Sequence, residues 1–212
     1  MEKWADLNLN NSNLKFTTPL PSKFDLNLIS NPYSKILDLG CGYGRALDYL
    51  YKNGFKNLTG VDISRNFISQ AKEICPKARY FIQDFEVISL EEKFDLILLM
   101  GVVEYITTDK RQEEFFKKVF SLLNNGGYIF LETFAFDFSL NWKNYLFDFL
   151  KTGHWGKFTN SAGIECHHQS LGVLNSILNK YFKVIEIRKE QFTTWSSNPC
   201  KGYTVILKKE NN

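Results

Sequence analysis

Residues 36–45 read Ile-Leu-Asp-Leu-Gly-Cys-Gly-Tyr-Gly-Arg, and this stretch decides the fold of the 212-residue chain. The apolar residues around Asp38 are typical of the end of a buried strand. Gly40, Gly42 and Gly44 stand at alternate positions, where glycine allows a tight turn and lets the backbone approach a ligand closely. Residues 46–50 then favour a helix, and its first N–H groups would face a polar ligand.

The spacing of the glycines excludes two common classes of nucleotide-binding loop. A dinucleotide fingerprint has glycines at its first, third and sixth positions, but Arg45 stands at the sixth position here. A phosphate-binding P-loop ends in Gly-Lys-Ser/Thr, which this loop lacks. The form Asp-x-Gly-x-Gly-x-Gly instead resembles motif I of the class I S-adenosylmethionine (SAM) methyltransferases. A tight turn in another α/β fold is the alternative. The resemblance implies SAM as the cofactor, S-adenosylhomocysteine (SAH) as its product, and contacts from Asp38, Gly40, Cys41, Gly42 and Gly44.

An acid about 20 residues beyond the glycines is the second feature of the motif. Asp62 ends the β-rich run of residues 58–62, where nucleotide-binding α/β folds place a carboxylate for the ribose hydroxyls. An ordinary turn or capping acid is the alternative. Ile63 is expected beside the cofactor, and Ser64 is expected to cap a helix over residues 65–75.

Two later positions also match the family. A strand is expected over residues 78–82, and the resemblance then implies that Asp84 and the backbone of Phe85 contact the adenine. A solvated loop acid is the competing interpretation of Asp84. The apolar run of residues 94–101 is typical of a strand buried on both faces. It resembles the family's fourth strand, which would place Met100 beside the methyl donor.

The remaining elements complete the predicted fold. A helix from about Asp109 carries an aromatic stripe at helical spacing, which we interpret as core packing. Residues 122–132 resemble the family's helix end, double-glycine turn and fifth strand, and residues 181–187 and 203–207 resemble its last two strands. The resemblance spans about residues 30–133 and 169–208. It predicts a seven-stranded Rossmann-like α/β sheet flanked by helices, mostly parallel with an antiparallel last strand, and an aromatic-rich insertion after the fifth strand.

Composition limits the class of protein. The length predicts a single domain over residues 1–212, and the net charge of +3 comes without a basic stripe, so we expect no nucleic-acid partner. No apolar stretch reaches the roughly 20 residues that span a bilayer, so we expect no membrane partner. Four cysteines without Cys-x-x-Cys spacing favour a reducing, cytoplasmic location. Residues 1–30 are interpreted as either a lid or a surface arm.

The insertion, residues 134–168, is the largest segment without a family counterpart. It is too aromatic for disorder, and residues 140–151 are expected to form a helix. Its aromatic residues could line a substrate pocket, pack on the core or face a partner subunit. Substrate contacts are expected from Tyr43, Glu104, Tyr105, Phe134, Trp142 and Trp155.

All three histidines of the chain lie in this insertion. Histidine titrates near neutrality and can remove a proton from an acceptor, so His167, His154 and His168, in that order, are candidates for the general base. Surface or core histidines are the alternative. Adjacent histidines do not converge on one ion in a regular strand or helix, so no metal is expected.

One absent motif bears on the substrate. Methyltransferases of DNA bases and of some amides resemble one another in an Asn/Asp-Pro-Pro-aromatic run after the fourth strand, where this chain has residues 100–105, Met-Gly-Val-Val-Glu-Tyr. We therefore expect a small-molecule acceptor, such as a sugar, a phosphorylated metabolite or a natural-product intermediate. Methylation at oxygen is favoured over methylation at nitrogen, and this preference rests only on the histidines of the insertion. The enzyme would be a monomer or a homodimer. The alternatives are an aminopropyltransferase-like relative and a catalytically silent SAM-binding subunit.

Overall fold

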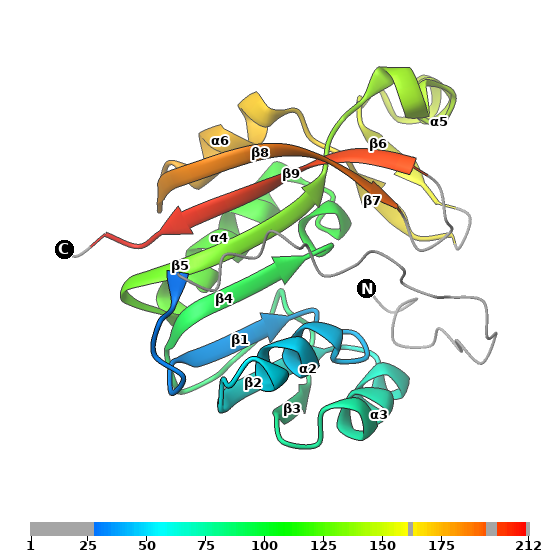
Figure 1. Ribbon diagram of the computed structural model, residues 1–212. Coiled ribbons are helices and arrows are strands. Elements are labelled where there is room, and N and C mark those ends of the chain that lie inside the picture. The colour runs from blue at the N-terminus through cyan, green and yellow to red at the C-terminus, as the bar shows by residue number, and fades with distance from the viewer. Residues whose placement is uncertain (1–27, 161–162, 194–198, 211–212) are drawn as a thin grey trace.

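Seven strands form one central sheet, shown in the computed structural model of Figure 1. The structure describes residues 28–160, 163–193 and 199–210. Residues 1–27, most of the predicted lid or arm, lie outside this part of the chain. The strands of the sheet are β1 (Lys35–Leu39), β2 (Asn57–Asp62), β3 (Arg79–Ile82), β4 (Phe94–Met100), β5 (Leu123–Phe134), β8 (Lys183–Thr193) and β9 (Pro199–Lys208).

Helices connect these strands, and a two-stranded hairpin stands apart from the sheet. The helices are α2 (Arg45–Lys52), α3 (Arg65–Ile74), the short 3-10 helix η2 (Val103–Tyr105), α4 (Asp109–Leu122), α5 (Phe138–Thr152) and α6 (Leu171–Leu178). The hairpin consists of β6 (Lys157–Thr159) and β7 (Glu165–His167), which pair antiparallel.

The strand order is β3-β2-β1-β4-β5-β9-β8. Neighbouring strands from β3 to β5 are parallel, whereas β9 runs antiparallel to both β5 and β8. The prediction of a mostly parallel seven-stranded sheet with an antiparallel last strand is therefore confirmed. The chain reverses its direction of winding between β1 and β4, and open α/β sheets bind ligands at such a switch point.

The sheet separates two hydrophobic cores. Helices α4 and α6 cover one face, where Phe115, Phe116 and Leu178 are buried against the strands. Helices α2 and α3 cover the other face with Leu47, Ile68 and their neighbours. The aromatic stripe of α4 is core packing, as predicted, and it continues by edge contacts from Phe116 to Phe182, whose ring centroids lie 6.4 Å apart.

Serine and threonine caps set the starts of three helices. Ser64 accepts a hydrogen bond from the Phe67 N–H at 3.3 Å, which confirms the predicted cap of α3. Thr108 does the same for α4, and Ser170 for α6. These bonds satisfy N–H groups that have no partner within the helix, and they fix where each connection leaves the sheet.

The structure differs from prediction near the double glycine. Residues 126–127 form an irregular part of β5 rather than a turn before it, because Gly126 N–H donates to the Lys209 carbonyl at 3.0 Å and Lys209 N–H donates to Gly127 at 2.9 Å. Gly126 has a φ of 74° there. Strands β8 and β9 are also longer than predicted. In the described part of the chain, no helix has the length and apolar character needed to cross a membrane.

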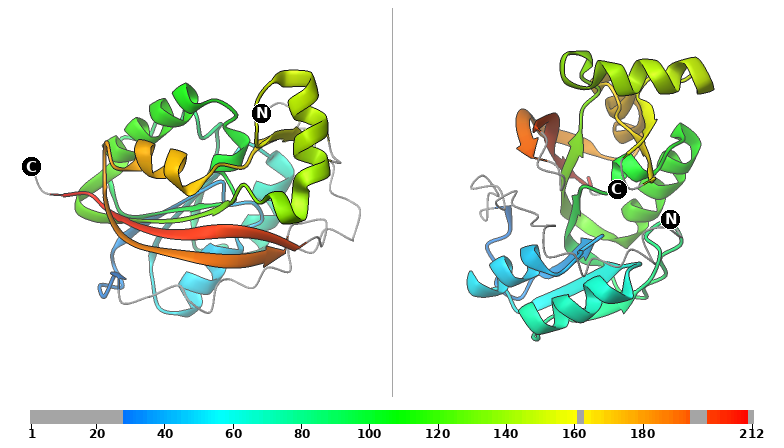
Figure 2. Two further views of the ribbon diagram at one scale, coloured as in Figure 1. Left: turned by 90° about the horizontal axis from the view of Figure 1, so that it is seen from above. Right: turned by 90° about the vertical axis from the view of Figure 1, so that its right-hand side faces the viewer.

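The two ends of the insertion lie side by side. Phe136 N–H donates to the Gln169 carbonyl at 2.9 Å, so the chain leaves β5 and returns to α6 at the same place. The predicted helix over residues 140–151 is confirmed as α5, whereas the β6–β7 hairpin was not predicted. Figure 2 shows α5 at the outside of the molecule, beyond the end of β5.

Candidate functional site

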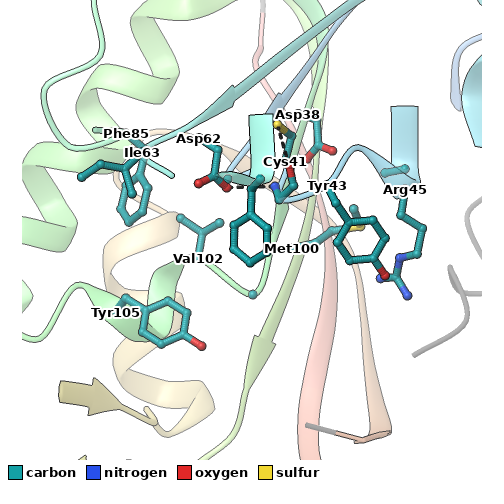
Figure 3. Close-up of a pocket in the computed structure, with 15 residues that line it drawn as sticks. Asp38, Cys41, Tyr43, Arg45, Asp62, Ile63, Phe85, Met100, Val102 and Tyr105 are labelled. Atoms are coloured by element: carbon teal, nitrogen blue, oxygen red, sulfur yellow. Dashed lines mark hydrogen bonds between the residues drawn. The ribbon is translucent and has the colours of Figure 1, made fainter. Parts of the chain in front are cut away.

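A pocket opens at the carboxyl ends of β1, β2 and β4, at the switch point of the sheet (Figure 3). It contains about 850 Å³ of space between its atoms, and this figure includes open solvent at the mouth of the pocket. Its lining residues are Asp38, Gly40, Cys41, Gly42, Tyr43, Arg45, Ala46, Asp62, Ile63, Phe67, Phe85, Met100, Gly101, Val102 and Tyr105.

The three motif glycines have left-handed backbone conformations for different reasons. A Cβ on Gly40, where φ is 83°, would lie 2.5 Å from Cγ2 of Val102. A Cβ on Gly44 would lie 3.0 Å from the Cβ of Ala71, so Gly44 allows close helix packing and is not part of the pocket lining. Gly42 has a φ of 52°, and a Cβ there would meet no atom within 4 Å. Its missing side chain therefore leaves room for a ligand.

Asp62 connects β2 to the glycine loop. Its Oδ2 accepts a hydrogen bond from Gly42 N–H at 2.8 Å, and its Oδ1 accepts one from Ser64 N–H at 2.9 Å. Burial raises the pKa of this carboxyl, while the backbone N–H groups of Ser64, Gly42 and Ile63 oppose the rise. Each oxygen keeps a further lone pair for a ligand hydroxyl, and the two bonds fix its orientation in advance. The arrangement fits the two hydroxyls of a ribose.

Asp38 supplies a second carboxylate at the end of β1. It is almost fully buried. Burial, followed by the nearby charge of Asp62, raises its pKa to about 7, and Arg45 partly opposes this shift. A ligand cation at this position would favour the ionised form, because opposite charge lowers the pKa of a carboxyl. Asp38 therefore fits a positively charged group such as an α-ammonium.

Apolar side chains form the other wall of the pocket. Ile63 follows β2 directly, and Phe85 follows β3 and packs edge-on against Phe115, with ring centroids 5.6 Å apart. Figure 3 shows Ile63 and Phe85 together beyond Asp62. These two side chains offer an apolar surface to a flat heterocycle attached to a ribose at Asp62. Asp84 is outside the lining, and its Oδ1 accepts a hydrogen bond from Glu86 N–H at 2.9 Å, so its contact with adenine stays a prediction.

Of the residues predicted to bind the substrate, Tyr43 and Tyr105 line the pocket. Figure 3 places Tyr43 beside Arg45 and Tyr105 on the opposite side of Met100. Glu104 lies behind the wall, since a Cβ on Gly101 would be 3.6 Å from its Oε1.

The Glu104 carboxyl has an unusual environment. It is 1% exposed, and its Oε2 accepts a hydrogen bond from the Thr133 hydroxyl at 3.3 Å. Its Oε1 has no hydrogen-bond partner among the described residues. Burial raises the pKa of Glu104 to about 7, which is close to the value that suits a general base at neutral pH.

The three histidines lie around a second cavity, not in the pocket of the glycine loop. This cavity lies between the insertion and the first residues of α4 and α6, and its lining includes His154, His167 and His168 together with Trp155 and Lys157. The prediction that these histidines act on the acceptor is therefore corrected in one respect, because none of the three lines the pocket of the glycine loop. Along β7 the side chains alternate between faces, so a strand that directs Cys166 to one side directs His167 to the other.

His168 is part of the packing of the insertion. It is buried, and its Nδ1 lies 2.8 Å from the Tyr145 hydroxyl. The rings of Phe158 and Phe134 lie 4.8 Å and 5.4 Å from it. Burial lowers the pKa of His168 to about 3 and that of His167 to about 4, so both are neutral at pH 7.

The aromatic residues predicted to bind the substrate are spread over the insertion. Phe134 packs against Phe192, with ring centroids 6.0 Å apart, and lies outside the pocket. Trp155 stacks on Phe149 at 4.1 Å and lines the second cavity. Trp142 is 43% exposed on α5. Among the described residues, no three His, Cys, Asp or Glu side chains come together as a metal site.

Sequence reasoning missed several residues of the pocket. Arg45 and Ala46 belong to the first turn of α2, Phe67 to α3, and Gly101 and Val102 follow β4. Arg45 and Val102 could have been predicted as pocket residues. Arg45 follows the glycine loop after β1, Val102 lies just beyond β4, and the carboxyl ends of these two strands meet at the switch point. Phe67 carried none, since a buried aromatic on a helix usually belongs to the core.

Comparison with known proteins places this site in context. Residues 36–127 match a family model described as a methyltransferase domain. A ubiquinone biosynthesis O-methyltransferase from Coxiella burnetii is 30% identical over 139 residues, which are 63% of this chain and 56% of that protein. A sphingolipid C9-methyltransferase from Gibberella zeae is 24% identical over 59% of this chain and 24% of its own. The chain thus spans about half the length of the O-methyltransferase.

Solved structures match over more of the chain. A SAM-dependent methyltransferase from Methanosarcina mazei has a TM-score of 0.78 and 25% identity, covering 86% of this chain and 95% of that one. The N-methyltransferase NodS from Bradyrhizobium japonicum, solved with SAH, has a TM-score of 0.63 at 18% identity, covering 88% of this chain and 83% of its own. At that identity NodS supports the fold alone.

Proposed function

Because this chain belongs to the class I, Rossmann-like family of SAM-dependent methyltransferases, we propose that it transfers a methyl group from SAM to an oxygen, or to a nitrogen, of a small molecule. The observation that carries the proposal is the joint placement of Gly42 and Asp62. Gly42 opens the loop to a ligand, and its N–H holds the Asp62 carboxylate in the same pocket.

The residues of the pocket have separate roles in this proposal. Asp62 binds the ribose hydroxyls, and Ile63 and Phe85 enclose the adenine. Asp38 faces the ammonium group of the methionine portion. Bound SAM supplies a methyl group that is already activated by its sulfonium. The protein must therefore chiefly align the acceptor with that methyl group and remove a proton.

Met100, Tyr43 and Tyr105 border the part of the pocket that remains for the acceptor. Glu104 is the candidate base that the structure favours, because it lies directly behind Gly101, has an unpartnered oxygen, and has a pKa near 7. A base among His154, His167 and His168 requires a movement of the insertion that brings one of them from the second cavity to the pocket. His167 is the first of these to test.

Oxygen is the acceptor atom that we favour. The sequence argument for oxygen depended on the histidines, which line another cavity, so it no longer carries weight. Support now comes from the 30% identical relative, whose name is that of an O-methyltransferase. A cytoplasmic location is proposed because the four cysteines are buried and form no disulfide with one another, which suits a reducing compartment.

Incubation with isotopically labelled SAM and a metabolite extract tests the proposal. Mass spectrometry should detect an extract component that gains the labelled methyl group with the wild-type protein but not with Asp62→Ala. A parallel incubation with decarboxylated SAM, whose sulfonium carries an aminopropyl group, would support the aminopropyltransferase alternative if it gave an aminopropylated product. SAM binding without any labelled product would support the catalytically silent subunit.

A further inference from the structure

Helix α5 presents an apolar face to solvent. Trp142 is 43% exposed, Phe147 62% and Leu150 76%. Trp142, Leu146 and Leu150 are four residues apart, so they form one row along the helix, and Phe147 lies beside that row. Among the described residues, exposed apolar side chains such as Ile74, Val173 and Ile185 come from three different elements, α3, α6 and β8. A contiguous apolar face of this kind marks an interaction surface.

The opposite face of α5 is fully used in packing. Tyr145 is completely buried, and its ring lies 4.7 Å from Phe136 and 5.7 Å from Phe158. Phe149 stacks on Trp155. Because this face anchors the helix to the insertion, the outward row does not serve the fold of the domain. Figures 1 and 2 show α5 at the periphery, with its outer side turned away from the sheet.

Charge on the outward face restricts the partner. Lys143 and Lys151 border the apolar row, and their amines lie 5.8 Å from the Trp142 ring and 4.0 Å from the Phe147 ring. Asp148 is the one acid in the sequence of α5, and it accepts a hydrogen bond from Thr159 N–H at 3.0 Å on the inward side. A second copy of this face would bring lysines toward lysines with no acid between them, so the face suits an anionic partner.

We propose that the outward face of α5 docks on the surface of a lipid bilayer that contains anionic lipids. Tryptophan and phenylalanine prefer the boundary between headgroups and acyl chains, and flanking lysines extend along apolar surface to reach the charged headgroups. The expectation of no membrane partner came from the lack of a spanning segment, and peripheral docking does not need one. The proposal is independent of the methyl-transfer reaction.

Vesicle flotation of the full chain tests this proposal. One set of vesicles contains phosphatidylcholine alone, and the other contains phosphatidylcholine with about a third phosphatidylglycerol. The protein should float with the anionic vesicles and remain unbound with the neutral ones. Because each lysine near an anionic surface contributes about a fivefold gain in affinity, Lys143→Glu with Lys151→Glu should weaken binding by well over tenfold.

Two variants distinguish binding through the apolar face of α5 from non-specific hydrophobic binding elsewhere on the protein. Trp142→Ser with Phe147→Ser should abolish flotation, whereas Val87→Ser, which removes a 69% exposed apolar side chain elsewhere, should leave it unchanged. Thermal unfolding with and without SAH checks that each variant is folded. Brominated lipids should quench part of the tryptophan fluorescence of the wild-type protein, and Trp142→Ser should remove that part, which assigns it to Trp142 among the four tryptophans of the chain.

Three results would overturn the proposal. The first is no flotation of the wild-type protein with anionic vesicles, and the second is flotation that the α5 variants leave unaltered. The third is a dimer in sedimentation experiments, without vesicle binding, that Trp142→Ser with Phe147→Ser dissociates. That last outcome would assign the face to a second copy of the chain.

Discussion

Replacement of Asp62 by alanine should weaken binding of SAM and SAH without unfolding the protein. A hydrogen bond to a charged group contributes about 1.5–3 kcal/mol. Loss of one ribose contact therefore predicts a drop in affinity of roughly tenfold to a hundredfold. The structure adds a second effect, because the same carboxylate holds Gly42 N–H at 2.8 Å and Ser64 N–H at 2.9 Å. Both donors lose a partner, so we expect the upper part of that range.

The effect on stability should be smaller than the effect on binding. Removing Asp62 leaves two backbone donors unpaired, but it also removes a carboxylate whose pKa burial raises, and these effects oppose each other. A net cost of about 1 kcal/mol would lower the Tm of a chain of this size by about 2–4 °C.

Isothermal titration with SAH is the assay for this prediction. Asp48→Ala is the matched control, because it removes an acid that pairs with Lys52 on α2 at 2.6 Å and lies outside the pocket. The control should bind SAH like the wild type. A folded Asp62→Ala protein with unchanged SAH affinity would refute the role of Asp62 and the reasoning from the glycine loop.

Three further predictions concern the same pocket. Gly42→Ala should lower SAH affinity at least about tenfold, as measured by titration. Gly54→Ala, at another positive φ with open space around it, should leave affinity unchanged; equal losses would mean that backbone strain alone is responsible. Because the Asp38 pKa is raised to about 7 and a bound ammonium would lower it, SAH binding near pH 7 should release protons and tighten as the pH rises. Titration in buffers of different ionisation enthalpy measures this, and a zero proton count would exclude Asp38 as the ammonium contact. If Glu104 is the base, turnover should fall as the pH drops below about 7, because the carboxyl is then protonated. Glu104→Gln should remove this fall in turnover at low pH and should lower turnover by about a hundredfold. If His167 is the base instead, turnover should fall near its pKa of about 4, and His167→Ala should remove that fall.

The cofactor half of the fold was predictable because its signals are local. Glycines at alternate positions, an acid after the next strand and Ser64 as a helix cap each act through a few neighbouring residues. The apolar run of β4 is equally direct, because a strand buried on both faces has few alternatives. The number of strands and their mostly parallel direction then followed from the family resemblance, and the structure confirms both.

The insertion was predictable only in its helix. The β6–β7 hairpin consists of two three-residue strands, which are too short for a periodic pattern. Whether His167 or Cys166 faces the second cavity depends on the register of that hairpin, since one residue of shift exchanges the two faces. The partner of His168 is Tyr145, 23 residues away, and no local pattern identifies such a contact. Glu104 was noted in the sequence, but its raised pKa comes from burial that only the folded structure reveals.

Thermal-shift titration of the wild-type protein with SAH, SAM, NAD and ATP tests the central claim most directly. A ligand at 100 times its dissociation constant stabilises the folded state by about 2.7 kcal/mol, which corresponds to a rise in Tm of about 5–10 °C. The account predicts this rise with SAM and SAH and far weaker shifts with NAD and ATP. Stabilisation by NAD but not by SAM or SAH would contradict the assignment of the pocket.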